Sequence, residues 1–379
     1  PVMPQCGTSF NHSEAGMTAL TPRERMQTLL AKQIPDHMGL YEHFWPETLR
    51  DYWPEQGYPR DADPVDVFHY DLRGGPWPID PAPFLGQEII LEETDEWTIT
   101  RNGFGGVQRN WRHKSGTPEH IDFTIVTPRK WEEVKPNLQY LNPDRIRLKE
   151  CEEFLQKARR EDRFWTFGGL LHFELLRGIL GDVCMLESFL LEPEWIADFC
   201  ETYTQFYIRH LTYVLEHVAV PDGAFVYEDL GFSNGPFCSP KTYRELIFPH
   251  HKRIIDFFHD RGLPVIFHSC GDIRQMVPHL IDAGIDCLQP MEVKAGVDIF
   301  DLVEKFPGKL AYMGNMDVTV LNSNDPKIIE PYLREKIAAL REKNVPYIFH
   351  SDHSIPPDID LSTYRMMLDI YRQEGVYNR

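Results

Sequence analysis

Short apolar runs alternate with longer amphipathic segments from about residue 146 onward. The apolar runs are Phe164–Phe167, Ala224–Tyr227, Pro264–Phe267, Asp286–Leu288, Lys309–Met313 and Pro346–Phe349. The segments between them, such as 239–261 and 272–283, have helical periodicity. Continuous apolar strands that alternate with helices indicate a parallel sheet buried on both faces. With a further run at Met38–Phe44 the strand candidates number seven. That is close to the eight of a (β/α)8 barrel, and we predict this α/β fold.

The first 145 residues depart from this pattern. Residues 1–20 have no periodicity and predict a disordered tail. Residues 21–24 (TPRE) have the spacing of a helix capping box with proline in the first turn, and predict a helix start. Residues 46–145 are rich in Trp, Pro, Asp and Gly. Two stretches within them alternate like antiparallel strands, namely Gln87–Arg101 and Glu119–Val126. We therefore predict one barrel domain over 21–379 with an insertion or lid at about 46–145.

Charge and motif content exclude several classes of protein. The net charge of −19 repels phosphate backbones and anionic lipid, so neither nucleic acid nor a membrane is expected as a partner. No apolar run approaches the ~18 residues that span a bilayer, and no secretory signal is recognised. Glycine-rich dinucleotide and P-loop motifs are also absent. The seven cysteines are irregularly spaced, which argues against a disulfide framework and predicts a cytoplasmic location.

Polar side chains follow six of the predicted strands. Because the carboxyl ends of the strands form the active site of such a barrel, we expect these side chains to surround one pocket. The residues expected to bind substrate are Glu42, His43, Trp45, Gln289, Asn315 and His350. The residues expected to be catalytic are Glu228, Asp229 and Asp352. For Glu228 and Asp229 the alternative is that they cap a helix or supply loop charge, and for Asn315 that it is a turn residue.

The segment His268-Ser269-Cys270 is the sharpest local motif. Residues i and i+2 of an extended segment point the same way, so this imidazole and thiol can bind one ion. Nitrogen and sulfur ligands favour Zn²⁺, and a catalytic zinc has three protein ligands and one open position. The alternative is a buried thiol beside a hydrogen-bonded histidine. The candidates for the third ligand are His353, Asp352, His350 and Glu228.

Several segments resemble the uroporphyrinogen decarboxylase superfamily. They are Thr21–Arg25 with Ile34–Asp36, Phe267–Pro290, and Tyr312–Asn315. The resemblance implies a (β/α)8 barrel. True uroporphyrinogen decarboxylases have an arginine-rich loop after the first strand, whereas this chain has Tyr41–Pro46 there, without arginine. The corrinoid-dependent methyltransferases of the superfamily instead bind zinc through an HxC motif and a later cysteine. His268 and Cys270 match that motif, and His353 stands at the place of the later cysteine.

The methyltransferase branch therefore supplies the functional hypothesis. It implies an enzyme with zinc on His268, Cys270 and His353. The enzyme would move a methyl group between a small methylated or thiol substrate and a corrinoid. Because the chain has no DxHxxG cobalamin motif, the corrinoid is expected on a partner protein. Two alternatives stay open: a metal-independent decarboxylase of a small cyclic or aromatic acid, and a non-catalytic tetrapyrrole- or corrinoid-binding protein. A homodimer is also left open.

Overall fold

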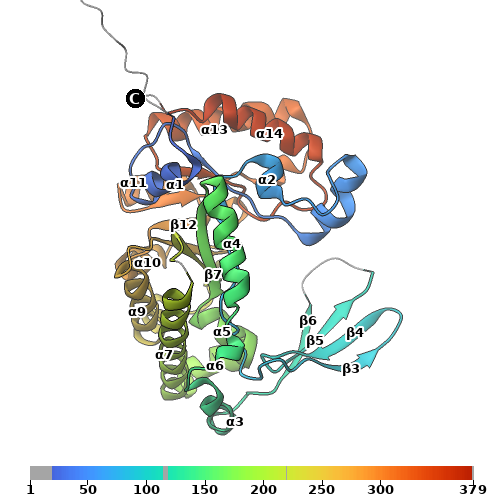
Figure 1. The fold of residues 1–379 in the computed structure, drawn as a ribbon, viewed down its shortest axis with the longest axis vertical. Helices are drawn as coiled ribbons and strands as arrows, with labels where there is room; N and C mark the ends of the chain where they lie inside the picture. The colour runs from blue at the N-terminus through green and yellow to red at the C-terminus, as the bar shows by residue number, and fades with distance from the viewer. Residues whose placement is uncertain (1–18, 114–117, 219, 378–379) are drawn as a thin grey trace, which may run out of the picture.

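Eight parallel strands form a nearly closed barrel in the computed structural model, which describes residues 19–113, 118–218 and 220–377 (Figure 1). The spatial order of the strands is β1-β14-β13-β12-β11-β8-β7-β2. Their bounds are β1 Gly39–Leu40, β2 Leu72–Gly74, β7 Phe164–Leu170, β8 Gly223–Tyr227, β11 Val265–Ser269, β12 Cys287–Pro290, β13 Ala311–Met313 and β14 Tyr347–Phe349. The predicted (β/α)8 fold is thus confirmed. The eighth strand, β2, lies within the 46–145 segment that we had assigned to the insertion.

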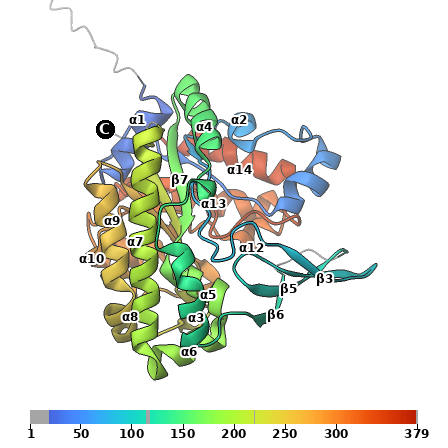
Figure 2. The same ribbon diagram turned by 60° about the horizontal axis from the view of Figure 1, so that its bottom comes forward.

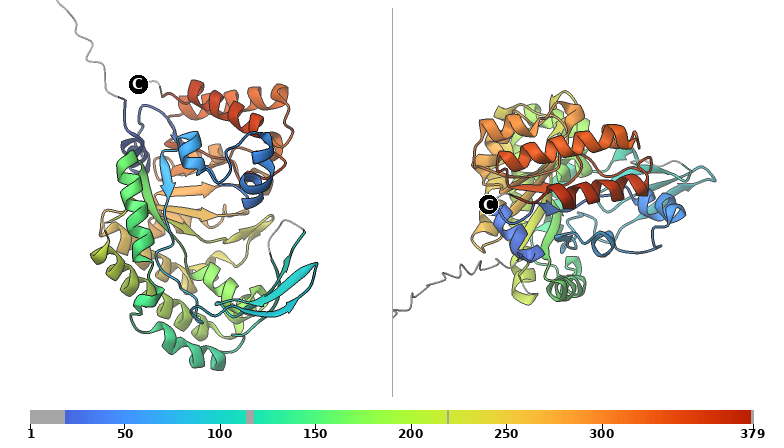
Figure 3. Two further views of the ribbon diagram at one scale, coloured as in Figure 1. Left: turned by 45° about the vertical axis from the view of Figure 1, so that its right-hand side comes forward. Right: turned by 90° about the horizontal axis from the view of Figure 1, so that it is seen from above.

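Helices cover the outside of the barrel, and several pack side by side. Figure 2 shows α7, α9 and α10 together, and Figure 3 shows α13 beside α14. The helices before the third barrel strand are α1 Pro22–Leu30, α2 Pro64–Phe68, α3 Pro128–Val134 and α4 Leu148–Glu161. Those up to β11 are α5 His172–Leu180, α6 Asp182–Leu191, α7 Pro193–His217, α8 Pro240–Leu246 and α9 Phe248–His259. The remaining helices are α10 Val277–Ala283, α11 Ile299–Lys305, α12 Val318–Leu321, α13 Pro326–Glu342 and α14 Leu361–Glu374. Within the described residues, we find no helix with the length and apolar character that a bilayer crossing requires.

Two helix predictions can be compared with these bounds. The capping box at Thr21 is present: the Glu24 N–H donates to Thr21 Oγ1 at 3.2 Å, and the Thr21 N–H donates to Glu24 Oε2 at 2.9 Å. The segment predicted as one helix over 239–261 is instead two helices, α8 and α9. Pro249 stands in the first turn of α9, where its missing N–H is tolerated, and the preceding helix ends before it.

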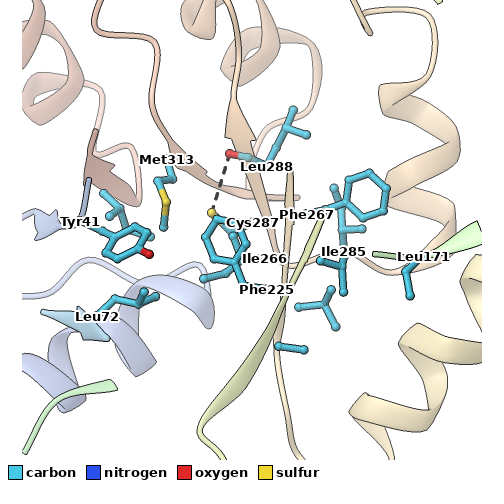
Figure 4. Packing of buried hydrophobic residues seen from close by; sticks show 14 of the residues in the cluster. Tyr41, Leu72, Leu171, Phe225, Ile266, Phe267, Ile285, Cys287, Leu288 and Met313 are labelled. Carbon is cyan, nitrogen blue, oxygen red and sulfur yellow. Dashed lines mark hydrogen bonds between the residues drawn. The ribbon is translucent and has the colours of Figure 1, made fainter. Parts of the chain in front are cut away.

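Side chains from different strands meet in the buried core. Figure 4 shows Leu72, Phe225, Ile266 and Met313 close together, and all four are at most 1% exposed. At roughly 25 cal/mol per Å² of buried apolar surface, this packing is the main favourable term in folding.

The side chain of Asp71 joins the first two barrel strands. The Asp71 N–H donates to the Leu40 carbonyl at 2.9 Å, and the Leu40 N–H donates to Asp71 Oδ2 at 2.8 Å. The other carboxylate oxygen accepts from Arg25 Nη1 at 2.7 Å. A carboxylate therefore takes the place of a carbonyl in the ladder between β1 and β2.

A four-stranded antiparallel sheet, here called the arm, projects from the barrel (Figures 1 and 3). Its strands are β3 Ile89–Glu93, β4 Trp97–Arg101, β5 Gly106–Trp111 and β6 Glu119–Phe123. The stretch Gln87–Arg101 therefore contains two paired strands, and β5 was not predicted. The arm carries apolar side chains that face solvent, with Ile90 61% and Ile121 45% exposed.

We expect Asp71→Ala to lower the free energy of unfolding by about 3 kcal/mol, because it leaves the buried Leu40 N–H without its acceptor and removes one of the two carboxylates that pair with the Arg25 guanidinium. Urea unfolding followed by circular dichroism measures this change. Asp51→Ala is the control, since Asp51 is 45% exposed and pairs only with the adjacent Arg50, and its effect should stay within ~0.5 kcal/mol. Equal effects of the two substitutions would contradict a role of Asp71 in closing the barrel.

Candidate functional site

His268 and Cys270 lie together at the carboxyl end of β11. His268 Nε2 is 3.4 Å from Cys270 Sγ. The opposite ring nitrogen, Nδ1, is hydrogen-bonded to the side-chain oxygen of Gln289 at the end of β12. Because an amide oxygen only accepts, Nδ1 carries a proton, and Nε2 is the ring nitrogen that faces the thiol. A proton on Nδ1 leaves Nε2 as the atom through which this histidine could bind a metal.

Asp229, which follows β8, contacts both residues. Its Oδ1 atom accepts from the Cys270 N–H at 2.9 Å and lies 3.2 Å from His268 Nε2. Burial by itself raises the pKa of Asp229, but the contacts with His268 and Cys270 outweigh it and lower the pKa to about 2. The side chain is therefore an anion at neutral pH.

A second group of side chains that could hold a metal shares Cys270. The ligand atoms of Cys270, Glu292 and His353 lie within 4.8 Å of one another, and so do those of Asp229, His268 and Cys270. Glu292 was not predicted as a site residue, although it stands two residues after the end of β12. The rule that placed the other candidates, a polar residue after a buried strand, would have found it.

The surroundings of Cys270 are anionic. Burial raises the pKa of the Cys270 thiol, and the neighbouring carboxylates Asp229 and Glu292 raise it further. In each of the two groups, the Cys270 thiol thus stands with one imidazole and one carboxylate. This donor set matches the ligand preferences of Zn²⁺, and a cation there would balance the local negative charge.

Glu228 has a different place from the one we predicted. Its carboxylate accepts from the N–H groups of Phe173 and Glu174 at 2.9 and 2.7 Å, in the first turn of α5. It also accepts from His251 Nε2 at 2.6 Å. These contacts are those of a helix cap, the alternative that the sequence had left open for this residue. Glu228 groups with the buried His172 and His251 and not with Cys270.

Asp352 and Asn315 both bind the loop that carries Glu292. Asp352 accepts from the N–H groups of Val293 and Val318, each at 2.9 Å. The side-chain amide of Asn315 donates to the carbonyls of Met291 and Val297 at 2.6 and 2.8 Å. Both hydrogens of that amide are used inside the protein, which differs from the substrate contact that we predicted for Asn315. Asp352 likewise holds backbone, and its catalytic role stays a prediction.

A buried polar network continues from His268 into the barrel. Gln289 Nε2 is 3.4 Å from His350 Nε2, which lies 3.1 Å from His43 Nδ1. His43 Nε2 in turn lies 3.1 Å from the Tyr227 hydroxyl. Glu42 accepts from Ser351 Oγ at 2.8 Å, and burial raises the pKa of Glu42 to about 8. Glu42 Oε1 also lies 3.3 Å from His350 Nε2, so the predicted residues Glu42, His43, Gln289 and His350 form one connected network.

Trp45 and His353 form the outer wall of the site. Their rings stack with centroids 6.0 Å apart and planes 20° apart. Both side chains are partly exposed, and stacking limits the rotation of the His353 imidazole.

A cleft of about 1150 Å³ leads to the site. One wall is the arm, with Ile121 and Phe123, and the other is formed by α5 and α6, with Arg177 and Leu191. Asp229 also lines the cleft. A molecule bound in this cleft would contact both the arm and Asp229, which lies beside Cys270.

Comparison with known proteins supports the barrel fold and identifies the family to which the chain is similar. The family model of uroporphyrinogen decarboxylase (URO-D) matches residues 184–374, a range that contains His268, Cys270, Glu292 and His353. A solved methyltransferase from Methanosarcina mazei has the same fold, with a TM-score of 0.66 over 93% of this chain and 99% of that chain at 12% identity.

Two curated relatives match shorter stretches. The methylated-thiol–coenzyme M methyltransferase of Methanosarcina mazei is 29% identical over 86 residues, which cover 23% of this chain and 22% of that protein. The uroporphyrinogen decarboxylase of Chlorobium limicola is 25% identical over 140 residues, which cover 36% of this chain and 39% of that protein. The matched part thus spans about a fifth to two fifths of the length of these relatives.

We expect Glu228→Gln to lower the free energy of unfolding by about 3 kcal/mol and to leave Zn²⁺ binding unchanged. The amide places an N–H group against the N–H groups of α5, and it removes the negative charge at the helix N-terminus. Urea unfolding and a zinc titration measure the two effects, with the exposed Glu187→Gln of α6 as the control. A stable variant that had lost zinc would instead make Glu228 a metal ligand.

Proposed function

The chain belongs to the uroporphyrinogen decarboxylase family, and on that premise we propose that it is a zinc-dependent methyltransferase. It moves a methyl group between a small methylated or thiol substrate and a corrinoid carried by a separate protein. The observation that supports the proposal is that Cys270 belongs to two groups of possible metal ligands at the carboxyl end of the barrel, one with His268 and the other with His353. A thiol among imidazoles suits a metal that activates sulfur or oxygen.

The same site argues against a porphyrinogen substrate. A polycarboxylate needs cationic partners, but the loop after β1, residues 41–46, contains no arginine. The carboxylates of Asp229 and Glu292 lie beside Cys270. The guanidinium of Arg177 in the cleft is already paired with Glu174 at 2.6 Å and Asp182 at 2.9 Å. Like charges at this range oppose the binding of an anion.

Zinc would be held by His268, Cys270 and His353. When bound, it would act as a Lewis acid that stabilises a substrate thiolate or polarises the oxygen or sulfur that carries the methyl group. Gln289 holds His268 in the required tautomer through its contact with Nδ1. Trp45 fixes the plane of His353 by stacking.

The barrel residues beneath the metal-binding side chains would contact the substrate. His43, His350 and Tyr227 offer hydrogen-bonding groups close together, and Trp77 stacks on Tyr227 with centroids 5.9 Å apart. Aromatic walls with a few polar groups are typical of sites for small, largely apolar ligands. The cleft beside the arm supplies the approach for the second reactant, the methyl carrier.

Purified protein should contain about one zinc per chain, and Cys270→Ala should weaken zinc binding by on the order of 100-fold, because it removes a ligand. Metal analysis and competition with a chromophoric chelator measure this loss. Methyl transfer to free cob(I)alamin from a panel of methyl thioethers and aryl methyl ethers, followed by absorbance, should be lost in parallel.

Cys184→Ala is the matched control for this experiment. Cys184 is a half-buried thiol on α6 that belongs to none of the metal-binding groups found among the described residues. The control should keep both zinc and activity. Undiminished zinc in a His268→Ala, Cys270→Ala double variant would refute the metal site.

Uroporphyrinogen should not be turned over. Because the loop after β1 has no arginine and the carboxylates of Asp229 and Glu292 lie beside Cys270, we expect no coproporphyrinogen at enzyme concentrations that support methyl transfer. Chromatography with fluorescence detection of the oxidised porphyrins measures this directly. Turnover on the order of 1 per second or faster would make the chain a decarboxylase.

A further inference from the structure

We propose that the cleft beside the arm binds an extended segment of a partner protein, with alternating apolar and basic side chains, as a further strand on β6. The inference concerns a protein-binding surface and not the metal, so it goes beyond the proposed function and stands apart from it. Three features of the cleft support it: an open sheet edge, an apolar helix face opposite that edge, and an excess of carboxylates.

One wall of the cleft is the open edge of the arm sheet. β6 is the last strand in the order β3-β4-β5-β6, and within the described residues it pairs with β5 alone. Four consecutive residues of β6, 120–123, line the cleft, whereas no residue of β3, β4 or β5 does. Consecutive side chains of a strand point to opposite faces of its sheet, so a cleft that meets all four of them meets the edge. The unpaired N–H and C=O groups of a sheet edge can bind another strand.

The opposite wall carries an apolar helix face. Val183, Leu190 and Leu191 of α6 are 72%, 78% and 73% exposed, and no other large apolar side chain of the described residues is exposed to that extent. Their spacing of i, i+7 and i+8 places them on one face of the helix. Val183 and Leu191 line the cleft, as does Ile121 on the arm. Apolar side chains gathered in this way on a surface are typical of a site that another chain covers.

The charges around the cleft define the chemistry of the partner. Within the described residues, the cleft is lined by six carboxylates, those of Asp122, Glu174, Asp182, Glu187, Glu192 and Asp229. Among lysine and arginine side chains of that part of the chain, only Arg177 lines it, and Arg177 is already paired with Glu174 and Asp182. Glu187 lies four residues from both Val183 and Leu191, so charge and apolar surface alternate along α6. Lysine or arginine side chains set between apolar ones would complement both.

Other occupants fit the cleft less well. A second copy of the chain, with its net charge of −19, would bring the same carboxylates to this surface, and like charges oppose such a pairing. An anionic lipid surface is repelled for the same reason. Pockets for small molecules have volumes of about 300–1,000 Å³, and this cleft, at about 1150 Å³, is larger. A protein segment of opposite charge is therefore the occupant that the cleft favours.

Synthetic peptides test the proposal on the full chain. The probe is a fluorescein-labelled peptide of about nine residues, the length of a long strand, in which Val and Lys alternate. Fluorescence anisotropy should show binding that weakens as NaCl is raised, because exposed ion pairs are screened. A Val/Glu peptide of the same length should bind at least about 10-fold more weakly. The Val/Lys peptide N-methylated throughout should also lose binding, because it has no N–H groups to donate to the sheet edge.

Charge reversal on the rim of the cleft locates the binding site. Glu187→Lys together with Glu192→Lys should weaken binding of the Val/Lys peptide by about 10-fold or more and strengthen that of the Val/Glu peptide. The matched control is Glu152→Lys together with Glu153→Lys, on the exposed side of α4 and outside the cleft, which makes the same change in net charge and should alter neither affinity. Leu191→Ser should weaken the Val/Lys peptide several-fold through lost apolar contact, and it should fold normally because this side chain is mostly exposed.

Several results would overturn the proposal. They are failure of wild-type protein to bind the Val/Lys peptide, equal binding of the N-methylated peptide, and equal loss of binding in the two double variants. The last result would mean a general attraction to an acidic protein. A dimer in analytical ultracentrifugation that Leu191→Ser dissociates would make the cleft an interface between copies of the chain and would also contradict the proposal.

Zinc content separates this proposal from the proposed function. None of the substituted positions belongs to the metal-binding groups found among the described residues, so every variant should keep the zinc of wild type. Peptide binding without zinc would leave the docking site standing and the proposed function refuted. Zinc and methyl transfer without peptide binding would have the opposite meaning.

Discussion

Buried carboxylates that accept backbone N–H groups hold this barrel together. Each joins segments that are far apart in the sequence, and each supplies a charge-assisted hydrogen bond where a loop or strand would otherwise leave a donor unpaired. The examples are Asp71 with Leu40, Glu228 with Phe173 and Glu174, Asp286 with Val265, Asp352 with Val293 and Val318, and Glu42 with Ser351. The placement of the metal-binding side chains depends on these contacts, because they fix the strand ends from which the side chains project.

This use of carboxylates explains which parts of the site could be predicted from the sequence. The strand-end rule located His268 and Cys270, since their contact depends only on the local geometry of one strand. The strand-end rule could not distinguish a carboxylate with a catalytic role from one that holds the backbone in place. Glu228 and Asp352 have partners 23 to 59 residues away in the chain, and nothing near them in sequence indicates those partners. The same limit applies to Asn315, whose acceptors lie on another loop.

The fold was more predictable than the site, with one informative exception. Most barrel strands are runs of buried apolar residues, whereas β2 is the three-residue segment Leu72–Gly74 with an arginine at its centre. Arg73 is nevertheless 2% exposed. Its guanidinium forms ion pairs with Asp63, Asp66 and Glu161 on neighbouring segments. In the sequence, an arginine within a short segment looks like a surface residue, because the carboxylates that neutralise its charge lie in other segments. For that reason β2 was assigned to an irregular region.

Around the barrel that Asp71 helps to close, backbone pairing between neighbouring strands is extensive on one side and sparse on the other. β8 pairs with β7 over five residue pairs and with β11 over four, whereas β1 pairs with β14 over only two. Transient opening, as hydrogen exchange detects it, occurs first where backbone pairing is sparsest. His268 and Cys270 project from the end of β11, on the side where backbone pairing is extensive. The segment with His43 and Trp45 follows β1, on the side where backbone pairing is sparse. The segment with His43 and Trp45 can therefore adapt in shape while the thiol and imidazole keep their positions, and under the proposed function one scaffold would accept several related methyl compounds.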